Sequence, residues 1–358
     1  PMHEITFAMN DKPNLLGQLT SLLAERGLNI QEAHAFSTSD GYSLDVFVVY
    51  GWERDTEDLR EAVMRDLLKL EFRSKSQVHP VSSVDNHEQR DGTGVWEIDV
   101  AQLEIRGIVA SWLHGKVHEG TYCGQDVAIK IVDEEKVYDD SVEQEFRQEI
   151  YIIRQVRHKN AVQFIGACTK IPNFYIVTEF MSGGSVHDFL HHHGGVFELP
   201  SLLKTAIGIS KAMNHMHQKR IIHRDLRTEN LLMDEDQVVK VAEFGVARVQ
   251  ARSGAMTPET GTYRWMAPEV IQRKPYNHKA DVFSFGILLW ELLTGELPYG
   301  NLTAGQVIRG VVQEGLRPAI PEDTNEMLSG LIQSCWSQDP ALRPDFSRIV
   351  DILRQIGI

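Results

Sequence analysis

The sequence has few cysteines, no long apolar run and no excess of positive charge. Its three cysteines, Cys123, Cys168 and Cys335, are widely spaced and form no metal-ligand pattern, which favours a reduced intracellular compartment. No stretch of about 18 apolar residues is present to span a membrane, and no signal-peptide pattern opens the chain. The chain starts at Pro1 rather than Met, which is typical of a fragment. The predictions below therefore concern only the residues from Pro1 onward.

The charge balance argues against one broad class of function. The chain has 36 Lys and Arg residues against 50 Asp and Glu, which gives a formal net charge of −14. Nucleic-acid binding that depends on phosphate contacts needs the opposite sign, so no nucleic-acid partner is expected. The length of 358 residues and the hydrophobic content of 42% predict two or three domains with ordinary cores.

The first 74 residues have the pattern of one small α+β unit. Alternating apolar residues predict strands, and leucines at helical spacing predict two helices. The expected elements are a strand over 5–9, a helix over 15–23 ending near Gly27, strands at Asn29–Thr38 and Tyr42–Tyr50, a helix over 59–70 and a strand from near Glu71. This order is that of the ferredoxin-like split unit.

The same unit resembles an ACT regulatory domain, through the turn Asp11–Leu16 and the helix-to-strand step Gly27–Ile30. ACT domains commonly pair and bind amino acids or other small molecules, so the resemblance implies such a ligand and a homodimer. Asn14 stands where the family usually has glycine; it tolerates a left-handed backbone, but it would crowd a ligand close to the main chain. A domain used only for dimerisation or for contacting its neighbour is the alternative.

Residues 75–94 are polar and aperiodic, which predicts a flexible linker. The globular pattern resumes near Trp96. The expected organisation is therefore an ACT-like domain over 1–74, a linker over 75–94 and a second domain over 95–358.

The stretch Ile222–Asn230 contains the residue types that in-line phosphoryl transfer requires. The Asp225 carboxylate can accept the hydroxyl proton and orient the nucleophile, and the amide of Asn230, five residues later, can hold a magnesium ion. Apolar runs at 231–233 and 238–241 predict that the stretch is a loop between a helix and a hairpin.

Other motifs make residues 95–358 resemble a protein kinase. They are Val127–Lys130, His223–Asn230, Glu243–Gly245, Ala267–Glu269, Asp281–Gly286 and Leu342–Phe346. Gly261–Met266 and the ACT-like unit in front make the whole chain resemble the plant ACT-domain, Raf-like (tyrosine-kinase-like) Ser/Thr/Tyr kinases. The resemblance implies a bilobal domain, with a β-rich small lobe over 95–181 and a helical large lobe over 182–358.

The resemblance also implies ATP and Mg²⁺ as cofactors and assigns roles to single residues. Lys130 would bind nucleotide phosphates and Glu149 would fix that lysine; Glu143 and Glu145 share the same predicted helix, so this choice rests on the resemblance alone. Asn230 and Glu243 would hold the metal. The catalytic set is Lys130, Glu149, Asp225, Arg227 and Asn230. The nucleotide-binding set is Val109, Gly115, Val117, Ala128, Lys130, Thr178, Glu179, Met181 and Leu232.

Arg224, beside Asp225, implies control by phosphorylation, because an arginine there can pair with a phosphate on the activation segment. Ser253, Thr257 and Thr260 are the candidate acceptors, and Thr257 is preferred. A hydroxyl-rich loop without a regulatory role is the alternative.

Two further matches imply structural roles in the large lobe. Glu269 is expected to pair with Arg343, and Asp281 is expected to hold the backbone near His223.

Three positions depart from the kinase pattern. Glu243 replaces an aspartate, and its extra methylene moves the metal-binding charge by roughly 1.5 Å, a scale on which misplacement can cost about a hundredfold in rate. Trp112 stands at the central glycine of the phosphate-covering turn, with its side chain either turned to solvent or filling the nucleotide cleft. Arg227 replaces a lysine and keeps the charge, which favours Ser/Thr substrates. The sequence thus predicts a slowed kinase, with a pseudokinase that acts by binding and shape as the alternative.

A hypothesis from another class is a metal-binding regulatory protein centred on His187, His191, His192 and His193. The i, i+4 pair His187 and His191 can share a helix face and chelate zinc, but no cysteine or further spaced ligand supports it. The kinase resemblance implies instead protein substrates, chloroplast precursor proteins among them, and a cytoplasmic location.

Overall fold

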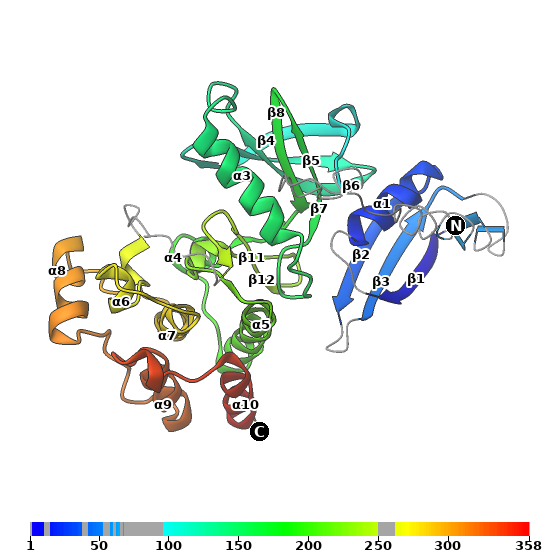
Figure 1. Ribbon diagram of the computed structural model, residues 1–358. Helices are drawn as coiled ribbons and strands as arrows, with labels where there is room; N and C mark the ends of the chain where they lie inside the picture. Colours follow the sequence, from blue (N-terminus) through cyan, green and yellow to red (C-terminus); the bar gives the residue numbers. More distant parts are fainter. Residues whose placement is uncertain are drawn as a thin grey trace, which may run out of the picture. The chain divides into compact units, whose positions relative to one another are not determined.

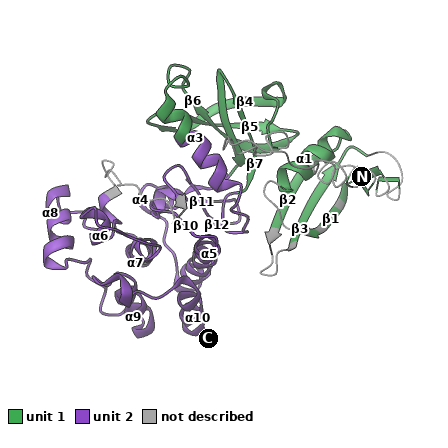
Figure 2. Cartoon of the chain, viewed as in Figure 1, with its two compact units in different colours: residues 1–144, 163–180 green, residues 145–162, 181–358 purple. Residues whose placement is uncertain are grey.

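The computed structural model describes residues 2–10, 15–37, 42–52, 58–59, 62–64, 67, 96–249 and 262–357. They fall into two compact units, residues 1–144 with 163–180 and residues 145–162 with 181–358 (Figure 2). Among the described residues, no helix combines the length and apolarity that a membrane crossing requires.

An antiparallel three-stranded sheet and one helix open the first unit (Figure 1). The elements are β1 (Met2–Asn10), α1 (Leu15–Glu25), β2 (Asn29–Ser37) and β3 (Tyr42–Tyr50), with the strand order β1-β3-β2. The leucines of α1 pack on Phe47 and Val49, and Gly27 takes a φ of 72° just after the helix, as its predicted stop requires.

The first four predicted elements of this region are therefore confirmed. Residues 58–59, 62–64 and 67 are helical, and Leu59 and Val63 join the same core, in agreement with the second predicted helix. The last predicted strand, the linker and the turn that includes Asn14 lie outside the described residues.

A five-stranded antiparallel sheet with the order β4-β5-β6-β8-β7 completes the first unit. Its strands are β4 (Leu103–Trp112), β5 (Gly115–Tyr122), β6 (Gln125–Val132), β7 (Phe164–Lys170) and β8 (Asn173–Glu179). Val127, Ile129, Ile165 and Val177 form its buried core. Helix α3 (Asp140–Ile153) contributes residues to both units and carries Glu143, Glu145 and Glu149, which the sequence predicts to share one helix.

The second unit is mainly helical. Its helices are α4 (Val186–His191), α5 (Leu199–Gln218), α6 (Pro268–Ile271), α7 (Lys279–Thr294), α8 (Ala304–Arg309), α9 (Glu326–Cys335) and α10 (Phe346–Ile356). Residues 280–292 of α7 are all buried, as expected of a helix that is apolar on nearly every face. Helix α10 packs along α5, and α9 packs along α7.

Short strands frame the predicted catalytic loop in this unit. They are β9 (Gly184–Ser185), β10 (Ile221–Ile222), β11 (Leu231–Met233), β12 (Val239–Val241) and β13 (Arg248–Val249). Strands β11 and β12 form the predicted hairpin. Residues 223–230, between β10 and β11, are the predicted loop and end in a single 3₁₀ turn, Thr228–Asn230.

Candidate active site

The catalytic loop is organised around the side chains of Asp225 and Asn230. The Nδ2 group of Asn230 donates to the Asp225 main-chain oxygen at 2.8 Å and to Asp225 Oδ2 at 2.7 Å. Asp225 Oδ1 is buried and has no hydrogen-bond partner among the described residues. A buried carboxylate oxygen left without a donor is costly unless a ligand supplies one. This atom is therefore suited to accept a proton from a bound hydroxyl group.

Arg227 lies between two carboxylates of the same loop. Its Nε is 3.6 Å from Asp225 Oδ2, and its Nη1 is 3.6 Å from Glu229 Oε1. These separations are too long for good hydrogen bonds. Within the described part of the chain, the guanidinium thus keeps donors available for a phosphate group beside Asp225.

The buried imidazole of His223 and the carboxylate of Asp281 hold the backbone of the catalytic loop through hydrogen bonds. The backbone N–H groups of His223 and Arg224 donate to the two Asp281 oxygens at 2.9 and 2.8 Å, which confirms the predicted brace. His223 Nε2 bonds the Ala242 carbonyl at 3.0 Å, so His223 Nδ1 accepts from the Asp225 N–H. Burial raises the pKa of Asp281, but hydrogen bonds from His217 and the Arg224 N–H hold that pKa below its ordinary value. Asp281 is thus a fixed anion.

The two predicted metal ligands lie at adjoining ends of the β11–β12 hairpin, Asn230 just before β11 and Glu243 two residues after β12. The Ala242 N–H donates to the Asn230 carbonyl at 2.9 Å, so Glu243 follows directly on the residue bonded to Asn230. Both amide hydrogens of Asn230 are used by Asp225, which leaves Asn230 Oδ1 for a cation. Glu243 has a left-handed backbone with φ of 65°. The donor set is oxygen only, which fits Mg²⁺.

Lys130 stands on β6 of the other unit, between two paired strands. Its backbone neighbours are Val117 on β5 and Ile176 on β8. Ala128, two residues earlier, is opposite Thr178. The structure therefore gathers four predicted nucleotide-binding residues, Val117, Ala128, Lys130 and Thr178, on three adjacent strands.

The indole of Trp112 lies over the ammonium group of Lys130. The Lys130 Nζ atom is 4.6 Å from the ring centroid, and the ring of His114 packs edge-on against the indole at 5.5 Å. Trp112 Nε1 is buried without a hydrogen-bond partner in the described part of the chain. Of the two orientations considered for Trp112, the structure shows the indole directed toward Lys130, the predicted phosphate-binding lysine, rather than toward solvent.

The β4–β5 hairpin, which carries Trp112, closes in a tight turn. Trp112 pairs with Gly115 across a two-residue tip, and a Cβ on Gly115 would collide with the carbonyl oxygen of Ile131. Glycine is required there by close backbone approach. Val109, farther back on β4, is 50% exposed, so its predicted nucleotide contact stays a prediction.

Three further nucleotide-binding candidates, Met181, Leu232 and Glu179, make other contacts in the structure. Met181 and Leu232 pack in one small cluster with Val162 and Ala242, which agrees with their joint assignment. Glu179 Oε1 accepts the backbone N–H of Gln163 at 2.8 Å. Lys130 and Glu149 belong to different compact units, so their pairing stays a prediction.

The Glu269–Arg343 pair is confirmed. Arg343 donates to both carboxylate oxygens of Glu269, at 2.6 and 2.9 Å, and is 1% exposed. Further bonds run to the carbonyls of Ser337 and Lys279. This planar, two-pronged contact uses the geometry that arginine has and lysine lacks.

The predicted regulatory residues are only partly described. Arg224 has a φ of 74°, and its guanidinium carbon lies 5.7 Å from the Tyr276 ring centroid. Ser253, Thr257 and Thr260 lie outside the described residues, so control by phosphorylation stays a prediction.

Glu291 on α7 is a residue that the sequence reasoning missed. Its Oε1 accepts from Thr228 Oγ1 at 2.8 Å and bonds His191 Nε2 at 2.9 Å, while its Oε2 accepts from Trp265 Nε1 at 2.9 Å. It thus links the catalytic loop to the segment before Ala267–Glu269. No local pattern marks it, because its partners are 26 to 100 residues away in sequence.

The four-histidine hypothesis is wrong in its membership. His192 bonds Asp188 Oδ1 at 2.8 Å, and His193 is exposed. Among the described residues, the one group of three side chains whose ligand atoms lie close enough to hold a metal ion is His187, His191 and Glu291. The local spacing identified the pair, whereas the third ligand comes from a distant helix.

Comparison with known proteins agrees with this geometry. The family model for protein tyrosine and serine/threonine kinases matches residues 104–353. The chain is 58% identical to serine/threonine-protein kinase STY17 and 57% identical to STY46, both from Arabidopsis thaliana, over 99% and 100% of its length. It spans 65% and 64% of those two relatives.

A third relative, serine/threonine/tyrosine-protein kinase HT1 of Arabidopsis thaliana, is 39% identical over 73% of this chain and 68% of its own length. The expected kinase resemblance is thereby confirmed over both the loop that carries Asp225 and the strand that carries Lys130. The chain belongs to the protein tyrosine and serine/threonine kinase family.

Proposed function

We propose that this chain is a protein kinase that transfers the γ-phosphate of ATP to Ser or Thr hydroxyls of proteins, and to Tyr as a secondary substrate. The observation that carries the proposal is the Asp225–Asn230 pair. One amide holds the carboxylate through two bonds of 2.7 and 2.8 Å, while Asp225 Oδ1 stays buried without a partner among the described residues. Family membership supports the same reading.

Each residue then has a distinct role. Asp225 accepts the proton of the substrate hydroxyl and orients its oxygen, and Arg227 places positive charge beside the transferred group. Lys130 binds the nucleotide phosphates, with Glu149 fixing it. Asn230 and Glu243 would hold Mg²⁺, which neutralises charge on the phosphate oxygens when bound.

We propose that this kinase is slowed at two positions. Glu243 offers its carboxylate at a longer reach than aspartate, and Mg²⁺ tolerates little deviation from octahedral geometry. The Trp112 ring must leave the Lys130 ammonium before that group can contact phosphates. The same contact favours the second candidate, a pseudokinase in which the indole permanently occupies Lys130.

The two functions are separated by one variant. Asp225→Asn removes the proton acceptor, so we expect labelled phosphate transfer to a generic protein substrate to fall by at least about a hundredfold. Asp236→Asn, at an exposed turn, serves as the matched control and should leave transfer unchanged. Wild-type protein that transfers no phosphate, or transfer that survives Asp225→Asn, would exclude the kinase proposal.

Finer features of the proposal rest on the resemblance alone. They are a cytoplasmic location, chloroplast precursor proteins among the substrates, an amino acid or similar ligand for residues 1–74, and a homodimer formed through that unit. Thermal shifts with amino acids test the ligand. Light scattering of the chain with and without residues 1–74 tests the dimer.

A further inference from the structure

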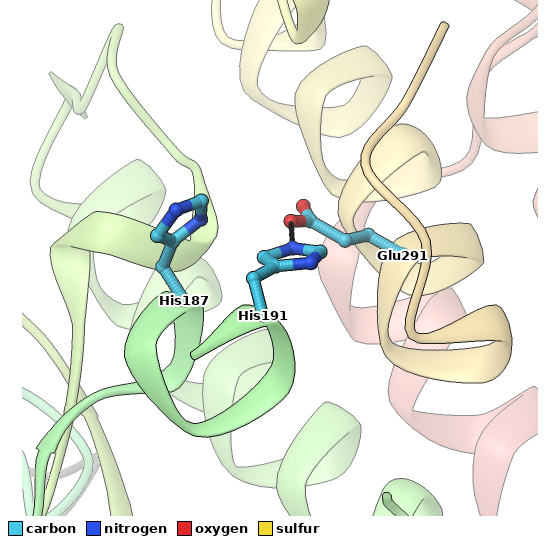
Figure 3. Close-up of side chains that lie close together, drawn as sticks. All are labelled: His187, His191 and Glu291. Atoms are coloured by element: carbon cyan, nitrogen blue, oxygen red, sulfur yellow. Dashed lines mark hydrogen bonds and ion pairs between the residues drawn. The ribbon is translucent and has the colours of Figure 1, made fainter. Parts of the chain in front are cut away.

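Two histidines and a glutamate form a cluster that phosphoryl transfer does not use. His187 and His191 stand on α4, and Glu291 comes from α7 (Figure 3). Each offers one ligand atom, and these atoms lie within 4.8 Å of one another. We propose that the three side chains bind a divalent transition-metal ion, with Zn²⁺ the best match.

Helix α4 presents the two imidazoles together. Ser185 caps the helix by accepting the Asp188 N–H at 3.0 Å, which fixes where the helix begins. The i, i+4 spacing then places His187 and His191 one turn apart on the same face, with ring centroids 4.6 Å apart. Figure 3 shows both rings on the side of α4 that faces the Glu291 carboxylate.

The ligand set matches zinc chemistry. Two imidazole nitrogens and one carboxylate are a known three-ligand zinc set, with a water molecule in the fourth position. Ligand bonds of about 2.0–2.2 Å place the donor atoms of a tetrahedral site roughly 3.3–3.5 Å apart. His191 Nε2 and Glu291 Oε1 are already 2.9 Å apart, so a side-chain movement of about 1–1.5 Å at His187 completes the site.

Burial and charge favour a cation at this position. The Glu291 side chain is 0% exposed, whereas His187 and His191 are 23% and 16% exposed and leave a path for an ion. Thr228 and Trp265 give the carboxylate neutral donors only, and a buried carboxylate is stabilised further by a positive partner.

His187 has a nitrogen available for this role. Its Nδ1 is buried without a hydrogen bond in the described chain, and the nearest carboxylate oxygen recorded for it, Glu229 Oε1, is 3.9 Å away. A separation of 3.9 Å is too long for a hydrogen bond. Losing the His187 imidazole should therefore disturb the fold little, which makes His187 the informative position to mutate.

The experiment is a calorimetric titration of the full chain with Zn²⁺. Millimolar Mg²⁺ keeps the predicted Asn230–Glu243 site filled, and a Cys123→Ser background removes the half-exposed thiol. We expect one equivalent to bind, with affinity lowered at least about tenfold in both His187→Ala and His191→Ala. The exposed neighbour in His193→Ala is the matched control and should bind as the parent does.

Cobalt substitution gives a second readout that does not depend on phosphate transfer. Co²⁺ should give visible d–d absorption without a thiolate charge-transfer band, and His187→Ala should lose that absorption while its melting temperature without metal stays unchanged. Equal binding by the parent and both histidine variants, or no uptake at micromolar Zn²⁺, would overturn the proposal. In either case the contact between His191 and Glu291 would be a hydrogen-bonded pair without a metal-binding role. Failure here leaves the kinase proposal intact.

Discussion

The two halves of the predicted kinase centre are built differently. In the large-lobe half, the catalytic loop is held by side chains that are themselves buried, such as Asp281 at 0% exposure. In the small-lobe half, Trp112 ends a strand on which Glu104–Ser111 are all exposed, and its indole is held by ring contacts with Lys130 and His114. The predicted catalytic loop is therefore held by several mutually supporting hydrogen bonds, whereas the Trp112 indole is held by weaker ring contacts at the end of an exposed strand.

The strongest test of this contrast breaks the buried brace of the large lobe. Glu269→Ala leaves the Arg343 charge buried and uncompensated, so we expect the free energy of unfolding to fall by about 3–5 kcal/mol. Urea titration followed by tryptophan fluorescence measures this change. Glu314→Ala removes a partner of Arg309 in a pair that is 62% and 72% exposed, and it should cost less than about 1 kcal/mol. Equal losses in the two variants would contradict the contrast.

The variant Glu243→Asp tests whether the length of this predicted metal ligand limits the rate of phosphate transfer. A shorter side chain on a fixed backbone restores the geometry that Mg²⁺ prefers, so phosphate transfer should rise by up to about a hundredfold. Initial rates at several Mg²⁺ concentrations measure the gain. The exposed Glu235→Asp controls for the substitution itself. An unchanged rate would remove Glu243 as a cause of slow transfer.

The half-buried imidazole of His158, in the second compact unit, makes the stability of that unit sensitive to acid. Burial, with His215 and Lys159 nearby, lowers the pKa of His158 to about 4, and His158 Nδ1 accepts the Asn160 N–H at 3.1 Å. The unfolded chain binds this proton more readily, so stability present above pH 6.5 is lost as the pH falls toward 4. We expect a loss on the order of 2 kcal/mol.

Unfolding free energies between pH 7 and pH 4 measure this sensitivity to acid. His158→Gln should flatten the pH dependence, and the exposed His193→Gln should not. An identical slope in the two variants would exclude His158 as the source.

The smallest effect concerns the hairpin. Trp112→Gly frees the Lys130 ammonium from a contact worth about 0.5–1 kcal/mol, so Mg-ATP should bind roughly two- to fivefold more tightly by calorimetry. Leu113→Gly, at a 78% exposed tip position, loosens the same turn without removing the indole. If Leu113→Gly raises Mg-ATP affinity equally, the gain comes from a more flexible hairpin turn and not from loss of the indole.

The sequence by itself determined several helices and strands and the loop that carries Asp225 and Asn230. Alternating and helical spacing predicted β1, α1, β2, β3 and the β11–β12 hairpin, because these signals come from neighbours in the chain. The spacing of Asp225 and Asn230 predicted their joint role, and family matches predicted the Asp281 and Arg343 braces.

Only the tertiary structure decided where two side chains point. Sequence left Trp112 with two directions, and packing on Lys130 and His114 selected one. Glu291 carries no local signal, yet it joins α4, the catalytic loop and Trp265. The physical reason is that such contacts join residues far apart in sequence, so their geometry exists only once the helices and strands have packed.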